Sequence, residues 1–170
     1  SGTSGNAGER CLAGSVAVAV GPAAEGLLGP LADAAAKMVV GPGDQPGVQV
    51  GPLIRAEHRD RVAGWVDKGV AEGAELLVDG RGHMSRKGFF LGPTILDNVT
   101  SEMAVGREEI FGPVLSIARA ATRDEAIGTA HRSALGAMAT SFTPSGQRAR
   151  EFRARVGAGR RARNGPQAPP

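Results

Sequence analysis

The sequence predicts an α/β fold, with a three-layer arrangement in which flanking helices cover a parallel sheet. Short apolar runs alternate along the chain with longer segments whose apolar residues recur at helical spacing. Strands that alternate with helices favour a parallel sheet, because parallel neighbours need a long crossover connection. The 170 residues are 41% hydrophobic and 22% charged, which is typical of a globular domain with one core.

The first elements follow from simple patterns. Residues 16–20 alternate Val and Ala and predict a buried strand. A helix is expected to begin near residue 25 and to reach Met38, since apolar residues recur at helical spacing there. Residues 41–47 are dense in Gly and Pro and therefore predict a loop.

Residues 55–72 give the clearest helical pattern in the chain. An apolar stripe is expected to face the core, made of Val62, Trp65, Val66 and Val70. His58 falls in the first turn, where a surface or capping role is expected. No second His or Cys lies at ligand spacing, so the sequence predicts no metal site.

The remaining elements continue the alternation. Strands are expected at residues 74–78, 114–118 and 137–142, and residues 89–96 are expected to be extended chain with a Gly-Pro break. Helices are expected at residues 124–133, with Thr122 as N-cap, and at residues 145–156. We expect a domain over residues 1–157 and a disordered basic tail over residues 158–170, which hold no large apolar residue. The tail is either natural or the product of an out-of-frame reading.

Charge is distributed unevenly. Residues 147–170 hold seven arginines and one glutamate, whereas the other 146 residues carry 13 basic and 16 acidic groups. The acidic body argues against nucleic-acid binding. No run approaches the roughly 20 apolar residues of a membrane-spanning helix, and no signal core is visible at the start. With a single cysteine, these features favour a cytoplasmic protein without a membrane partner.

Cys11, the only cysteine, lies in a stretch of residues 5–15 that contains three glycines. The stretch predicts a short turn before the first strand, where a thiol can be approached by a substrate and act as a nucleophile. A lone cysteine is also compatible with a small buried hydrophobic residue that performs no chemistry. Local patterns leave both readings open.

Two sequence motifs favour the first reading. Gly-Glu-Arg-Cys-Leu-Ala at residues 8–13 resembles the nucleophile loop of the aldehyde dehydrogenase superfamily, and Glu-Glu-Ile-Phe-Gly-Pro-Val-Leu at residues 108–115 resembles its cofactor-contacting segment. Residues 51–54 and 88–95 are also similar to that superfamily. The Arg-Cys pair and residues 43–46 resemble the methylmalonate-semialdehyde dehydrogenase branch, and the resemblance suggests the C-terminal catalytic-domain part of such an enzyme.

The resemblance implies a specific chemistry. Cys11 would be the nucleophile that forms a thioester, and Arg10 would bind the substrate carboxylate. Glu109 and Phe111 would contact NAD. In this branch coenzyme A is the co-substrate, methylmalonate or malonate semialdehyde yields propionyl-CoA or acetyl-CoA, and family members are homo-oligomers.

The chain also departs from the family pattern. The dinucleotide-binding half and the oxyanion-hole asparagine that precede the nucleophile in the family do not occur in it, so we expect this chain alone to be inactive. The alternatives are an inactive remnant or interaction fragment of the family, an aldehyde dehydrogenase that deacylates with water, and a nucleic-acid binder that uses its basic tail.

Overall fold

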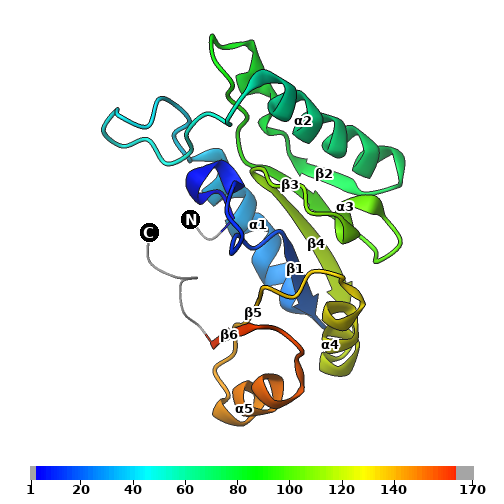
Figure 1. Cartoon of the computed structure of the whole chain (residues 1–170). Coiled ribbons are helices and arrows are strands. Elements are labelled where there is room, and N and C mark those ends of the chain that lie inside the picture. Colours follow the sequence, from blue (N-terminus) through cyan, green and yellow to red (C-terminus); the bar gives the residue numbers. More distant parts are fainter. Residues whose placement is uncertain (1–2, 164–170) are drawn as a thin grey trace.

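A four-stranded sheet forms the centre of the computed structural model, which describes residues 3–163 (Figure 1). Its strands lie in the order β1, β4, β3, β2, with bounds Val16–Val20, Val114–Ala120, Thr94–Asp97 and Glu75–Val78. The first three are parallel, whereas β2 is antiparallel to β3. The predicted α/β class is confirmed. β2 and β3 can run antiparallel because a loop with the short 3₁₀ helix η2 (Gly80–Ser85) joins them, and no crossover helix is needed.

Helices cover both faces of this sheet. On one face, α1 (Ala23–Ala36) packs through Leu28 and Leu31 against a cluster that includes Ile95 and Ile117. On the other face lie α2 (Ala56–Ala71) and the short α3 (Ala104–Arg107), as Figure 1 shows. Successive strand residues point to opposite faces, which explains why Ile95 and Leu96 belong to different clusters. The three expected layers are therefore present.

α2 is rotated relative to the expected stripe. Its buried residues are Val62, Ala63, Val66 and Gly69, whereas Val70 is 43% exposed, so the expectation for Val70 was wrong. Gly69 packs so closely that a Cβ there would lie 2.9 Å from Leu96 Cδ1. The absence of a side chain at this position lets the helix turn its small face toward the sheet.

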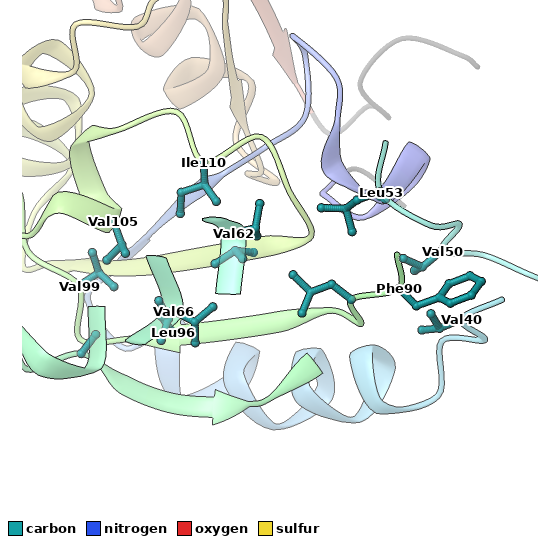
Figure 2. Close-up of a cluster of buried hydrophobic side chains, with 14 residues drawn as sticks. Val40, Val50, Leu53, Val62, Val66, Phe90, Leu96, Val99, Val105 and Ile110 are labelled. Carbon is teal, nitrogen blue, oxygen red and sulfur yellow. The ribbon is translucent and has the colours of Figure 1, made fainter. Parts of the chain in front are cut away.

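The cluster under α2 extends beyond the sheet (Figure 2). Val62 and Val66 from α2 meet Leu96 from β3 and Val105 from α3. The same cluster contains Leu53 and also Ala7, which belongs to the N-terminal 3₁₀ turn η1 (Gly5–Gly8). Apolar burial thus fixes this turn on the rest of the domain.

β1 lies at one edge of the four-stranded sheet and is only partly covered. The sequence predicted a buried strand, but Val16 is exposed; the prediction was wrong because alternating apolar residues do not reveal how many neighbours a strand has. α4 (Arg123–Arg132) contacts β1 and β4. Its N-cap is Thr122, as predicted, since Thr122 Oγ1 accepts a 3.2 Å hydrogen bond from the Glu125 N–H.

The last described elements form a separate small sheet. β5 (Met138–Ser141), α5 (Gly146–Arg155) and β6 (Arg160–Arg163) follow one another, and β5 and β6 pair in parallel. β6 lies within the segment that the sequence predicted to be disordered; the pairing uses backbone groups, which Arg-rich sequence supplies as well as any other. The rest of the predicted tail, residues 164–170, lies outside the described residues. Within residues 3–163, no helix has the length and apolar character needed to cross a bilayer.

Candidate active site

Two motifs far apart in sequence meet at one edge of the sheet. Cys11 and its turn precede β1, and residues 108–113 precede β4. β1 and β4 are adjacent and parallel, with Val16 opposite Ser116. Because the amino ends of adjacent parallel strands lie at the same edge, the fold places both loops side by side.

The two loops touch through glycines. A Cβ on Gly8 would lie 2.1 Å from the Gly112 carbonyl oxygen, and a Cβ on Gly112 would lie 2.6 Å from Val62 Cγ1. Gly8 also has a φ of +75°, which side chains other than glycine rarely adopt. The turn that contains Gly8, the segment of residues 108–113 and α2 are therefore stacked, with no room for a side chain at Gly8 or Gly112.

The turn before Cys11 has an unusual backbone. Asn6 and Ala7 have φ values of 54° and 52°, in the left-handed region that costs roughly 1–2 kcal/mol per residue. Burial of Ala7 in the core cluster offsets this cost, and Asn6 Nδ2 donates a 3.0 Å hydrogen bond to the Glu9 carbonyl. A backbone that is held against its preference is typical of functional loops.

Cys11 lies at the surface, in a tight turn closed by a 3.1 Å hydrogen bond from the Ala13 N–H to the Arg10 carbonyl. The reading of Cys11 as a small buried residue is therefore wrong. Arg10 folds back over the same loop, since its Nη1 would lie 4.0 Å from a Cβ on Gly5. The thiol and the guanidinium thus belong to one compact loop.

The facing segment presents the two residues that the sequence associated with cofactor contact. Glu109 is exposed, and Phe111 is 37% exposed with a φ of 57°. Ile110 between them is buried in the core cluster and anchors the segment. A bulky residue with left-handed backbone is a genuine outlier, and here it turns an aromatic ring outward while its neighbours stay buried.

Three residues that sequence reasoning did not bring together connect the two loops. His58 Nε2 lies 2.8 Å from the Phe111 carbonyl oxygen and 3.2 Å from Glu9 Oε1. Arg61 Nη2 lies 3.1 Å from His58 Nδ1 and donates a 3.2 Å hydrogen bond to the Ile110 carbonyl. The Glu9 carboxylate also accepts a 3.3 Å hydrogen bond from the Ile54 N–H. His58 was expected to lie at the surface or to cap the helix, and its i to i+3 spacing to Arg61 was the only available signal.

Over residues 3–163, no group of three His, Cys, Asp or Glu side chains gathers closely enough to hold a metal ion. What the site does contain is an accessible thiol on a rigid turn beside an exposed carboxylate and an exposed aromatic ring.

The sheet, the thiol turn and the segment packed against it define a member of a known enzyme family. Residues 1–169 match the model of the aldehyde dehydrogenase family, and the chain belongs to that family. The resemblance seen in the two motifs is thereby confirmed.

Relatives narrow the comparison. The chain is 44% identical over 156 residues to a malonate-semialdehyde dehydrogenase of Halalkalibacterium halodurans, which covers 91% of this chain and 32% of the relative. A crystal structure of methylmalonate-semialdehyde dehydrogenase from Oceanimonas doudoroffii superposes with a TM-score of 0.92 at 39% identity, covering 97% of this chain and 35% of that one. The crystal structure of a Mycobacterium tuberculosis aldehyde dehydrogenase in complex with NAD⁺ superposes with a TM-score of 0.91 at 31% identity. The match covers 95% of this chain and 34% of that one.

The chain therefore spans about a third of the length of these relatives. In that third it retains both loops of the site and the strands that place them.

Proposed function

We propose that this chain supplies the nucleophile of an NAD-dependent, CoA-acylating dehydrogenase that converts methylmalonate or malonate semialdehyde to propionyl-CoA or acetyl-CoA. The carrying observation is the exposed Cys11 on a strained turn that packs, through Gly8, against the segment with Glu109 and Phe111. The names of the relatives in Halalkalibacterium and Oceanimonas support the substrate class.

Cys11 would act as a covalent catalyst. Its thiolate adds to the aldehyde carbon, so that an S–C bond forms and the carbonyl π electrons move to oxygen. The Cys11 backbone N–H would donate a hydrogen bond to that oxyanion. When the aldehyde hydrogen leaves with its electron pair, the C=O bond forms again and Cys11 carries a thioester.

NAD, when bound, would accept that electron pair and hydrogen. The residues present fit such a cofactor at its nicotinamide end. Glu109 is exposed and would accept hydrogen bonds from ribose hydroxyls, and Phe111 offers an outward aromatic face to the ring. Ile110 holds both in place from the buried side.

Arg10 would select the substrate. A semialdehyde that carries a carboxylate needs a fixed cation near the thiol, and a guanidinium can bind a carboxylate with two parallel hydrogen bonds. Arg10 is adjacent to Cys11 and folds over the same loop.

Coenzyme A would complete the reaction. Its thiolate attacks the Cys11 thioester carbon, a new S–C bond forms to coenzyme A, and Cys11 leaves as thiolate. The substrate carboxylate departs as carbon dioxide, the electron pair of the broken C–C bond stays on the acyl group as a thioester enolate, and a proton from water neutralises it, so that the acyl group is one carbon shorter. We propose that the whole protein is a cytoplasmic homo-oligomer and that this chain alone does not turn over.

Selective alkylation of the thiol tests this proposal on the chain as it is. Cys11 is the sole cysteine, so the second-order rate constants with iodoacetate and iodoacetamide report on it alone. The ratio of iodoacetate to iodoacetamide rates should fall up to roughly fivefold in Arg10→Met, because the variant removes a unit charge that attracts the anionic reagent, and a charge pair in contact in water is worth about 1 kcal/mol.

The control is Arg150→Met, which removes an exposed arginine on α5. The control should keep the ratio of the unmodified chain. Equal ratios in all three proteins would show that Arg10 does not attract carboxylates to the thiol, and the assigned substrate class would fail.

A further inference from the structure

We propose that His58 is a positioning residue, which fixes the nucleophile turn relative to the segment of Phe111 through one ring nitrogen. The inference rests on the proposed function, because it concerns the placement of Cys11. His58 lies on α2, and the polar partners of its ring are the Glu9 carboxylate, the backbone carbonyl of Phe111 and Arg61.

The neighbours of the imidazole determine its tautomer. Nε2 lies within 3.2 Å of two acceptors, the Phe111 carbonyl and Glu9 Oε1, so Nε2 carries the hydrogen. Nδ1 faces Arg61 Nη2, which can only donate, so Nδ1 offers its lone pair. The Nε2–H of His58 is thereby shared between acceptors on the two loops. The hydrogen bond from Arg61 to Nδ1 fixes the ring in this orientation.

The two side chains of the bridge, His58 and Glu9, have little access to water. The His58 and Glu9 side chains are 11% and 14% exposed. A carboxylate with so little access to water depends on the donors around it, here the His58 ring and the Ile54 N–H. Without the ring, Glu9 would turn toward solvent, and it lies only two residues from Cys11.

The other end of the shared bond restrains Phe111. Its carbonyl belongs to a residue with φ of 57°, a conformation that its own sterics disfavour. The His58 N–H and the bond from Arg61 to the Ile110 carbonyl hold two successive carbonyls of this segment. Loss of His58 should therefore free both loops, although it lies in neither.

The experiment compares three substitutions at His58 by the alkylation ratio of Cys11. His58→Leu removes both polar atoms, His58→Asn shortens the side chain so that it cannot reach, and His58→Gln keeps an N–H near the position of Nε2. His131→Leu is the matched control, because His131 contacts the Arg155 carbonyl and the Gly157 N–H at the far end of the domain. Melting temperatures are measured for every variant, and rates are compared well below them.

We expect the ratio of iodoacetate to iodoacetamide rates to fall roughly threefold to fivefold in His58→Leu and His58→Asn, since the Glu9 charge would then approach an anionic reagent at the thiol. His58→Gln should keep the ratio of the unmodified chain. His131→Leu should lower the melting temperature but leave the ratio of iodoacetate to iodoacetamide rates unchanged. If His58→Leu does not fold, His58→Asn carries the comparison.

An unchanged ratio in His58→Leu or His58→Asn would overturn the positioning role, as would a His58→Gln protein as defective as His58→Leu. Arg10→Met separates this inference from the proposed function. If Arg10→Met lowers the ratio and His58→Asn does not, only the positioning role fails; if the reverse holds, the substrate assignment of Arg10 fails and the positioning role stands.

Discussion

The region around α2 and the unit of β5, α5 and β6 are held by different forces. Around α2, one cluster of buried apolar residues extends from Ala7 to Val114 and includes both motif loops. In the C-terminal unit, α5 has no buried residue. Arg155 instead contacts Asp124 at 2.7 Å and Glu151 at 3.2 Å, which joins α5 to α4 and to itself.

The difference indicates which region can hold a precise site. Close packing leaves side chains one arrangement and transmits strain, so the turn at Cys11 can keep its left-handed residues. Exposed ion pairs each contribute about 0–1 kcal/mol and are screened by salt. We therefore expect changes of volume to damage the α2 region most, and changes of pH or salt to act on the C-terminal unit.

Leu96→Ala should give the largest effect of the comparison. Leu96 is fully buried between β3 and α2, and its truncation should lower the free energy of unfolding by about 2–5 kcal/mol. Phe142→Ala, just after β5, removes a larger side chain that is 77% exposed and should change it by about 0.5 kcal/mol or less. Urea unfolding followed by Trp65 fluorescence measures both. Equal shifts would remove the distinction between the two regions.

Gly8→Ala should give the second largest effect and lower the free energy of unfolding by about 2–3 kcal/mol. A side chain on a residue with left-handed backbone and overpacking against a neighbour each contribute to this loss. The added Cβ would meet the Gly112 carbonyl. Gly26→Ala is the control: Gly26 lies in α1 with nothing within 4 Å of its Cβ position, so alanine should stabilise the helix by about 0.5–1 kcal/mol. If Gly8→Ala is as stable as the unmodified chain, the close packing of the two motifs is wrong.

Local patterns in the sequence were sufficient for most of the elements. The alternating run at β1, the stripe of α2 and the Thr122 cap depend on residues that are neighbours in sequence. The antiparallel direction of β2 and the exposure of Val70 and Val16 were not predicted. These features depend on which strand lies next to which and on how closely Gly69 approaches Leu96. The spacing of apolar residues along the sequence carries no information about either.

The site divides in the same way. Cys11 and Phe111 were identified from short motifs, and the structure brings their loops together. The roles of Cys11, Arg10, Glu109 and Phe111 in catalysis stay predictions. The bridge through His58 could not be predicted, because its contacts reach 49 residues back to Glu9 and 53 residues forward to Phe111 and exist only once the register of β1 and β4 is set.

Acidification should act on the C-terminal unit. The hydrogen bond from Arg155 lowers the pKa of Asp124 below its usual 3.8, and the hydrogen bond from Arg123 lowers the pKa of Glu151 below its usual 4.5. A carboxyl group whose pKa is lowered by folding contributes stability above its unfolded pKa and loses that contribution as pH falls through the folded value. The contribution is therefore complete at pH 6 and declines below about pH 4.5.

Hydrogen exchange measures this smallest effect by region. Protection factors of α5 amides should fall more than those of α2 amides between pH 6 and pH 3, since α5 relies on groups that become protonated over this range. The double variant Asp124→Asn with Glu151→Gln should show at pH 6 the low α5 protection that the unmodified chain shows at pH 3, and little further change on acidification. Parallel losses in α5 and α2 would mean that the two regions unfold as one unit, so that ion pairing in α5 has no separate role in its stability.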